Sequence, residues 1–267
     1  MIPYLKAQIE KLFTPETQRA TVREYLQMRI LQSLQRAGAM IPLAFHGGTA
    51  LRLLYQLPRY SEDLDFALER QPEQYDFRKY LTAIQQDLTA ETYNVEIKLN
   101  ERNVVHSAFI RFRGLYHQLD ISPHQSEVLA VKLEIDTKPP ANAVLDTTFV
   151  EHHVAIHLQH HDRASLLAGK LHAILQREYI KGRDWYDLYW YLNQKQWPAP
   201  NIDMLNSALV QTGWKKDIIV SDNWQAFVSE RLAQLDWNRV VEDVRRFLMK
   251  QEDLAKFKNE NIENLLV

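Results

Sequence analysis

The chain has 267 residues, enough for one large domain or two smaller ones, and its 46% hydrophobic and 25% charged residues are typical of a globular protein. The formal net charge of −2 excludes nucleic-acid binding through bulk positive charge, so such binding would need a local basic patch. The absence of cysteine excludes disulfides and thiolate catalysis, and without an apolar run of signal-peptide or membrane-spanning length we expect a cytoplasmic protein with no membrane contact.

The first half of the chain mixes segments with helical and with strand periodicity. Helices are expected over residues 15–37, 49–57 and 72–92. Strands are expected over residues 41–45, 64–68, 93–99, 104–112, 115–121 and 128–135. Because these strands do not alternate regularly with helices, we expect a mixed sheet rather than a fully parallel one.

From Asp162 onward the pattern is helical nearly to the end. Helices are expected over residues 164–179, 184–192, 204–212, 224–235 and 237–249. Residues 137–160 are rich in Pro, Ala, Asn and Asp, and with the histidines of the run His152–His161 they are assigned to a polar segment between domains. We therefore predict an α/β (α+β) domain over residues 1–155 and a helical domain over residues 156–267.

A glycine turn, Gly47-Gly48-Thr49, lies between an expected strand and an expected helix. Glycines let a ligand approach the backbone, and the free N–H groups at a helix start favour an anion. Thr49 could cap the helix or bind a phosphate oxygen. The alternative is a purely structural turn, which is common between a strand and a helix.

Two carboxylates, Asp63 and Asp65, follow within a short apolar run. Residues two apart in a strand face the same side, and paired negative charges are unfavourable unless a cation bridges them. Mg²⁺ takes carboxylate oxygens together with substrate phosphates, and two such ions can serve phosphoryl or nucleotidyl transfer. The alternative is a solvated acidic strand edge.

A third carboxylate would complete a two-metal site. Residues 131–136 alternate cleanly, with Lys132, Glu134 and Asp136 on the polar face of the expected strand. Glu134 is the preferred third ligand, while Asp136 and Asp120 remain open alternatives.

A lysine and an acidic helix start are the last candidates. Lys170 falls within the apolar arc of its expected helix, so it needs an anionic partner or must extend to water. Asp184 and Asp187 could stabilise the start of the next helix. Alternatively, one of them could orient Lys170 or Arg183, or act as a general base on an incoming hydroxyl.

Together these residues resemble the AbiEii-type nucleotidyltransferases, the toxins of bacterial type IV toxin–antitoxin and abortive-infection systems. The resemblance covers roughly residues 40–192, in motifs that are fairly specific only as a set. They are His46-Gly47-Gly48-Thr49-Ala50-Leu51-Arg52, Arg59 with Ser61-Glu62-Asp63-Leu64-Asp65-Phe66, Lys132-Leu133-Glu134-Ile135, Lys170-Leu171 with Ala173, and Arg183-Asp184 with Tyr186-Asp187-Leu188.

The resemblance implies a nucleotidyltransferase-like mixed sheet with flanking helices, followed by an all-helical C-terminal domain. It implies metal binding by Asp63, Asp65 and Glu134, with further catalytic roles for Lys170, Asp184 and Asp187. The residues expected around the nucleotide are Gly47, Gly48, Thr49, Arg52, Ser61, Lys170 and Arg183.

The implied reaction moves an NMP from an NTP to an acceptor with Mg²⁺ or Mn²⁺. The implied acceptor is RNA, notably the acceptor end of tRNA, and an antitoxin protein is a further implied partner. The alternative from another class is a nucleotide- or partner-binding module with the same fold and no turnover.

Overall fold

The computed structural model describes residues 2–267, which form two compact units. The first unit runs up to Tyr55 and adds Tyr60–Lys138 and Thr147–His160, and the second comprises Gln56–Arg59, Pro139–Asp146 and His161–Val267. Segments of the two units therefore alternate along the chain. The boundary expected between residues 155 and 156 lies within a strand, Val154–His161.

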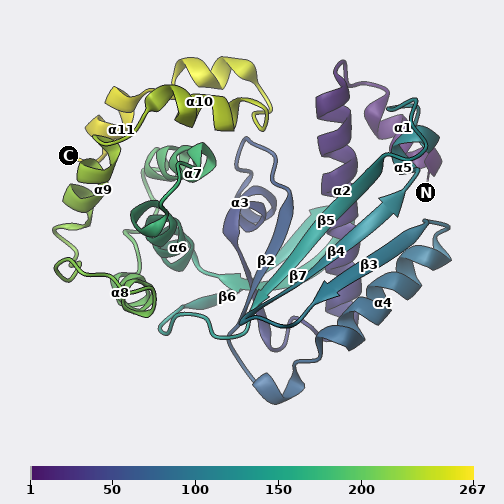
Figure 1. The fold of residues 1–267 in the computed structure, drawn as a ribbon, viewed down its shortest axis with the longest axis horizontal. Coiled ribbons are helices and arrows are strands. Elements are labelled where there is room, and N and C mark those ends of the chain that lie inside the picture. Colours follow the sequence, from purple (N-terminus) through teal and green to yellow (C-terminus); the bar gives the residue numbers. More distant parts are fainter. Residues whose placement is uncertain (1) are drawn as a thin grey trace. The chain divides into compact units, whose positions relative to one another are not determined.

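A seven-stranded sheet has the order β3-β4-β5-β2-β1-β7-β6 (Figure 1). The strands are β1 Leu43–His46, β2 Asp63–Leu68, β3 Val95–Asn100, β4 Val105–Arg113, β5 Val128–Asp136, β6 Leu145–His152 and β7 Val154–His161. β2 pairs with β5, and β1 with β7, in parallel, whereas the β1–β2, β3–β4 and β4–β5 pairs are antiparallel. The predicted mixed sheet is confirmed.

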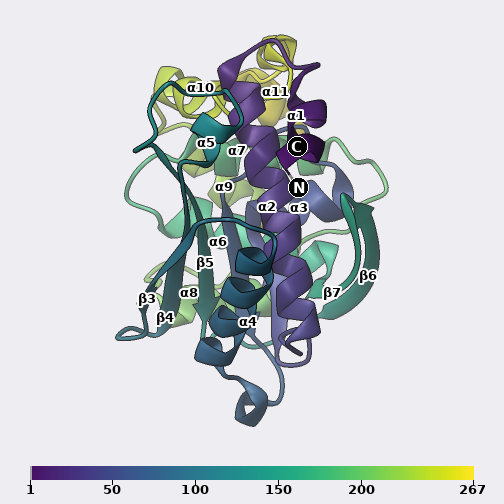
Figure 2. The same ribbon diagram turned by 90° about the vertical axis from the view of Figure 1, so that its right-hand side faces the viewer.

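The helices of the first unit are α1 Ile2–Ile9, α2 Pro15–Arg36, α3 Gly47–Tyr55, α4 Phe77–Ala90 and α5 Leu115–Gln118, with a short 3-10 turn at Pro72–Gln74. α2 begins as predicted, because the Thr14 hydroxyl accepts a hydrogen bond from the Thr17 backbone N–H at 3.2 Å and Pro15 follows it. α2 and α4 contact each other and pack against the same side of the sheet (Figure 2).

The sheet has a buried face under these helices and an opposite face that we call the polar face. In β5, Leu129, Val131, Leu133 and Ile135 are buried, while the residues between them are partly exposed. The same alternation in β2 buries Leu64 and Phe66 and leaves Asp63 and Asp65 partly exposed. Because side chains alternate along each strand, the apolar residues face the core and the two aspartates face the opposite side of the sheet.

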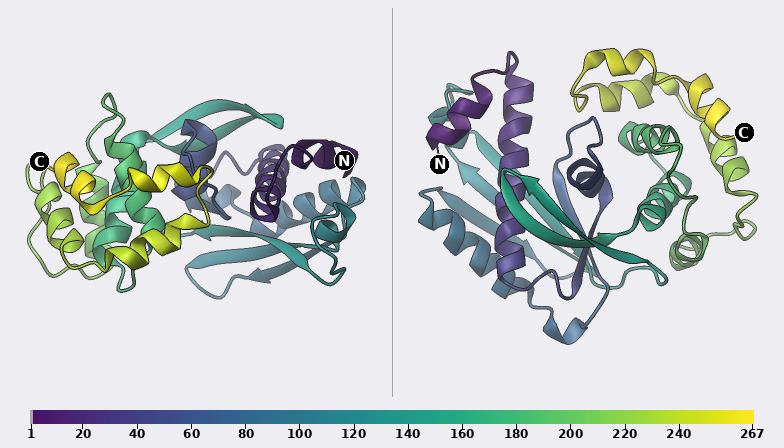
Figure 3. Two further views of the ribbon diagram at one scale, coloured as in Figure 1. Left: turned by 90° about the horizontal axis from the view of Figure 1, so that it is seen from above. Right: turned by 180° about the vertical axis from the view of Figure 1, so that it is seen from behind.

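The second unit is helical (Figure 3). Its helices are α6 Arg163–Gln176, α7 Gly182–Leu192, α8 Ile202–Gln211, α9 Trp224–Leu232, α10 Trp237–Arg245 and α11 Asn259–Leu265, with a 3-10 turn at Gln251–Ala255. α6 contacts α7, α8 and α9, while α7 also contacts α10 and α11. Among residues 2–267, no helix is both long and apolar enough to cross a membrane.

Two segments differ from the sequence-based prediction. Residues 115–121 were expected as a strand, but Leu115–Gln118 forms the single turn α5, because Leu115, Tyr116 and Leu119 are all buried and only a helical turn places them on one side. Residues 137–160 were expected to link the domains, but they contain β6 and most of β7, which extend the sheet beyond β1. The strand prediction was wrong. The polar segment is part of the sheet rather than a linker, although the chain passes between the two compact units at residues 138–139, 146–147 and 160–161.

Candidate functional site

The glycine turn lies directly against one of the two aspartates. β1 ends at His46, which pairs with Asp65 of β2, and α3 begins at the next residue. Gly47 has a φ of +78°, and a Cβ at this position would lie 2.5 Å from Oδ2 of Asp65. Glycine is therefore required at position 47 both by the backbone conformation and by the approach of the carboxylate.

Replacement of Gly47 by Ala should lower both stability and any activity that uses Asp65. The left-handed conformation costs about 1–2 kcal/mol in a non-glycine residue, and the new methyl group must also displace the carboxylate. Gly213→Ala is the matched control, since Gly213 has a φ of +79° but nothing within 4 Å of an added Cβ. Urea unfolding should show a larger loss of unfolding free energy for Gly47→Ala than for Gly213→Ala. Equal losses in the two variants would contradict the close approach of the Asp65 carboxylate to position 47.

The remaining residues of the turn are buried. Thr49 is 0% exposed, and its hydroxyl donates a short hydrogen bond to the backbone carbonyl of Asp63. Gly48 is also buried. In this arrangement the Thr49 hydroxyl ties the start of α3 to β2, so the predicted phosphate contacts of Gly48 and Thr49 stay predictions.

On the polar face, Asp63 and Asp65 belong to two neighbouring rows of residues that are paired across the strands. Asp65 is in register with Glu134 of β5, and Asp63 is in register with Lys132. Neighbouring strands are about 4.8 Å apart, so these four side chains form one patch. The Lys132 ammonium lies 2.8 Å from the Glu134 carboxylate. Lys132 thus offsets one of the three negative charges.

Whether this patch suits a metal ion can be tested on its donor set. Across residues 2–267, no three or more His, Asp or Glu side chains are grouped so that they could hold a metal ion on their own. Mg²⁺, however, commonly binds one or two carboxylates and completes its octahedron with substrate phosphates and water. Asp63 and Asp65 fit that mode of binding, in which the substrate supplies part of the coordination.

The two alternative third carboxylates have other contacts. Asp120 lies after α5 at a φ of +60°, and its largely exposed carboxylate is 2.6 Å from the Lys6 ammonium. Asp136 lies on the polar face, in register with Ala67, and accepts a hydrogen bond from the Lys138 backbone N–H at 2.9 Å. Glu134, in register with Asp65, is therefore the carboxylate of the three that stands next to the pair.

The predicted nucleotide contacts Arg52 and Ser61 have partners from α2. Nε of Arg52 donates to the carboxylate of Glu24 at 2.7 Å, and Nε2 of Gln27 donates to the Ser61 carbonyl at 3.1 Å. Burial raises the pKa of Glu24, but hydrogen bonds from His152 and Arg52 outweigh it and lower the pKa to about 2. Arg52 thus helps to fix α3 on α2.

The second unit holds a buried cluster of charges at the start of α7. The Lys170 ammonium lies 3.0 Å from Asp184 and 2.7 Å from Asp187. Arg59 donates two hydrogen bonds of 2.6 Å to the Asp187 carboxylate, and both side chains are almost fully buried. Lys170 thus lies among carboxylates, and we call these four residues the α7 cluster.

Within the α7 cluster, the charged forms of Lys170 and Asp184 are favoured. Burial lowers the pKa of Lys170, but Asp187 and Asp184 outweigh it and raise that pKa above its ordinary value. Burial raises the pKa of Asp184, but Lys170, Lys181 and Arg177 outweigh it and lower the pKa from 3.8 to about 2. The ionised form of Asp184 is therefore stabilised more in the folded protein than in the unfolded chain.

This shift predicts a pH-dependent contribution of Asp184 to stability. Because the folded pKa is below the unfolded one, the contribution is complete above about pH 4 and is lost as the pH falls towards 2. The difference in unfolding free energy between the wild type and Asp184→Asn, measured with urea at successive pH values, should shrink across this window. A difference between the wild type and Asp184→Asn that stays constant with pH would contradict the assignment.

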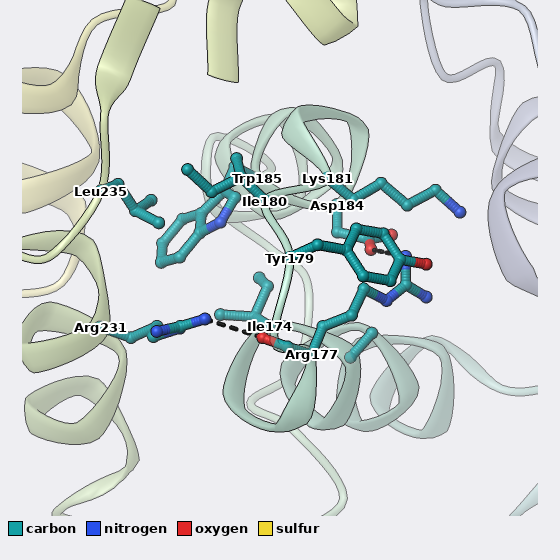
Figure 4. Close-up of a pocket in the computed structure, with 10 residues that line it drawn as sticks. Ile174, Arg177, Tyr179, Ile180, Lys181, Asp184, Trp185, Arg231 and Leu235 are labelled. Atoms are coloured by element: carbon teal, nitrogen blue, oxygen red, sulfur yellow. Dashed lines mark hydrogen bonds and ion pairs between the residues drawn. The ribbon is translucent and has the colours of Figure 1, made fainter. Parts of the chain in front are cut away.

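A cavity of about 10 Å³ adjoins Asp184 (Figure 4). Nη1 of Arg177 lies 3.0 Å from Oδ2 of Asp184, but without the alignment of a hydrogen bond. Nη2 of Arg231 donates to the Arg177 carbonyl at 2.7 Å. The cavity is of the size of a single water molecule, far too small for a nucleotide.

Arg183 is directed elsewhere within the second unit. Its guanidinium lies 3.5 Å from Asp243 of α10 and 4.1 Å from the ring centre of Phe247. The proposed pairing of Asp184 with a basic residue is seen with Lys170 and with Arg177. The convergence of Lys170 with Asp63 and Asp65 on one nucleotide stays a prediction.

Sequence reasoning assigned no role to Arg59, Lys132 or Glu24. Lys132 could have been found from its place beside Glu134 on the same face of one strand. Asp187, the partner of Arg59, lies 128 residues away in the sequence, and the Glu24 partners Arg52 and His152 lie 28 and 128 residues away, so no local pattern signals those contacts.

Comparison with known proteins identifies the family of this chain. The family model described as "Nucleotidyl transferase AbiEii toxin, Type IV TA system" matches residues 29–260. The chain belongs to this AbiEii family. A search of curated protein sequences finds no match to the chain.

Solved structures resemble this AbiEii family member in fold. JHP933 from Helicobacter pylori is 19% identical with a TM-score of 0.55, over 92% of this chain and 90% of that one. A candidate nucleotidyltransferase from H. pylori is also 19% identical, with a TM-score of 0.56 over 92% of both chains. At this identity the similarity shows the fold, and it confirms the predicted nucleotidyltransferase-like architecture.

Proposed function

We propose that this AbiEii family member is a metal-dependent nucleotidyltransferase that moves an NMP from an NTP to an RNA acceptor. The observation that carries the proposal is the placement of Asp63 and Asp65 on one face of β2, with Asp65 against the glycine turn at Gly47. That turn opens α3, whose N-terminus favours a phosphate. Two carboxylates and a helix N-terminus thus adjoin each other, which supports a site for a metal-bound triphosphate.

In the first unit, Asp63 and Asp65 would hold Mg²⁺ or Mn²⁺ together with the triphosphate. When bound, such ions neutralise phosphate charge and orient the attacking and leaving oxygens. Glu134, next to Asp65, would join the ligand set or orient it, and Lys132 would offer positive charge at the same patch. The backbone N–H groups of Gly47 and Gly48 would receive phosphate oxygens.

In the second unit, the α7 cluster holds the Lys170 ammonium in a fixed position. Lys170 is held by Asp184 and Asp187, so its ammonium is oriented before any ligand binds. We propose that it contacts the nucleotide, which supports catalysis by preorganised charge. The low pKa of Asp184 makes it a weak proton acceptor, which favours a positioning role over that of general base.

The family match supports a proposal for the biological setting. We propose that the chain acts as the toxin of a type IV pair in the cytoplasm, with an antitoxin partner and with tRNA as the preferred RNA acceptor. The AbiEii family match is what supports the toxin role and the partner.

Labelling of total RNA tests the proposed reaction. The protein is incubated with Mg²⁺, total RNA and each α-³²P-labelled NTP in turn, and the labelled product is identified by sequencing. Transfer to a discrete RNA with one or two of the NTPs is expected. Metal-dependent NTP binding in a calorimeter without labelled product would overturn the reaction and identify a non-catalytic nucleotide-binding module.

A further inference from the structure

The polar face of the sheet continues well beyond the acidic pair. Asp63 pairs with Lys132 of β5, Lys132 with Phe109 of β4, and Phe109 with Lys98 of β3. Directly paired residues of neighbouring strands project to the same side of a sheet. These four side chains therefore form one row across four strands, from the acidic pair to the edge at β3.

An aromatic ring lies in the middle of this row. Phe109 is 41% exposed, although the residues that flank it in β4, Ala108 and Ile110, are fully buried. The Lys132 ammonium lies 5.8 Å from the ring centre. An exposed phenyl ring between two lysines offers a stacking surface with positive charge on either side, which suits a nucleic-acid base and its phosphates.

The row ends at an open hollow of about 800 Å³ at the end of β3. Its lining includes Lys98, Arg102 and Arg78, and Glu101 forms an ion pair with Arg78 at 2.8 Å. Lys98 and Arg102 thus add positive charge at the far end of the row, despite the net charge of −2 for the chain. This is the local basic patch that RNA binding by an acidic protein needs.

We propose that this row, Lys132–Phe109–Lys98 with Arg102, binds the single-stranded 3′ end of the RNA acceptor. One base stacks on Phe109, and Lys98 and Arg102 contact the phosphates upstream of it. The inference rests on the proposed function in one respect, because the RNA end then points towards Asp63 and Asp65. Phe109 is a positioning residue in this account.

Fluorescence anisotropy with two labelled RNA hairpins tests the row without any turnover. One hairpin carries a short single-stranded 3′ end and the other is blunt. Phe109→Ala should weaken binding of the first hairpin by about ten-fold, the size expected for loss of one stacked base, and should leave the blunt hairpin unchanged. Phe149→Ala, which removes another exposed ring from β6, is the matched control.

The salt dependence of RNA binding tests the contribution of Lys98 separately. Lys98→Gln should reduce the slope of log K against log salt by about 0.7, as expected for one lost phosphate contact on a single strand. Lys11→Gln, which changes an exposed lysine between α1 and α2, should leave the slope unchanged. Equal affinities of Phe109→Ala and Phe149→Ala for the hairpin with the single-stranded end would overturn the proposal.

The two proposals can fail independently. If the wild type labels RNA but Phe109→Ala binds it as tightly as Phe149→Ala does, the row is wrong and the reaction stands. If no RNA is labelled but Phe109→Ala still loses binding, the reaction is wrong and the row remains an RNA-binding surface.

Discussion

Replacement of Asp65 by Asn should reduce nucleotidyl transfer by about a thousand-fold or more, because removal of a metal-ligating charge forfeits several kcal/mol of transition-state stabilisation. Asn has the same shape, so the pairing of β2 with β1 and β5 should be retained. The measurement is the initial rate of RNA labelling at saturating NTP and Mg²⁺, together with circular dichroism to confirm the fold.

Asp120→Asn is the control for this loss. Asp120 was a candidate third carboxylate, but it lies outside the patch and pairs with Lys6, so its replacement should leave the rate unchanged. The labelling rate of Glu134→Gln should lie between those of Asp65→Asn and Asp120→Asn, because Glu134 adjoins Asp65 but is also paired with Lys132. Full activity of Asp65→Asn would show that the Asp65 carboxylate of β2 does not hold a catalytic metal ion.

The second large effect is expected on stability. Asp187→Asn should lower the unfolding free energy by about 3–5 kcal/mol, the usual cost of breaking a buried ion pair from one side. The Asp187 side chain is 0% exposed and forms ion pairs with both Arg59 and Lys170, so its loss leaves these two buried cations with Asp184 as the one remaining carboxylate of the α7 cluster. Urea unfolding at neutral pH provides the measurement.

A surface pair gives the comparison. Lys216 and Glu230 are 2.8 Å apart with side chains about half exposed, so Glu230→Gln should cost less than about 1 kcal/mol. The double variant Arg59→Met with Asp187→Leu should recover part of the loss, since paired apolar replacements remove both desolvation costs. An Asp187→Asn protein as stable as Glu230→Gln would show that the α7 cluster has little role in stability.

The candidate carboxylates were predictable because their signal is local. Asp63 and Asp65 are two apart in a strand, and β5 alternates without interruption, so period-two reasoning places their side chains correctly. The sequence likewise indicated that Gly47 lies in a turn where glycine lets a ligand approach the backbone. Its closeness to Asp65, however, depends on the β1–β2 register. These features need only a few neighbouring residues.

The hairpin of β6 and β7 could not be read in the same way. In β7 the buried positions Ile156 and Leu158 are followed by His160, which is 0% exposed and pairs with the Thr148 hydroxyl at 2.8 Å. A histidine in a core position hides the alternation, and β6 carries exposed Phe149 on an edge strand. The polar composition therefore suggested a linker where the chain adds two strands to the sheet.

The α7 cluster and the row through Phe109 depend on long-range pairing. Lys170 was predicted to need an anionic partner, and Asp184 was among the candidates, but the contribution of Arg59 required the fold. Phe109 carries no sequence signal, because an aromatic residue in a strand is ordinarily core. Its exposure appears only once β3, β4 and β5 are in register.

Binding of Mn²⁺ tests the central claim most directly, because it needs neither an acceptor nor turnover. Electron paramagnetic resonance counts the Mn²⁺ ions bound to the protein in the presence of a non-hydrolysable NTP analogue. We predict Mn²⁺ binding that depends on the analogue and is lost in both Asp63→Asn and Asp65→Asn. Undiminished binding in these two variants would contradict a metal site on β2.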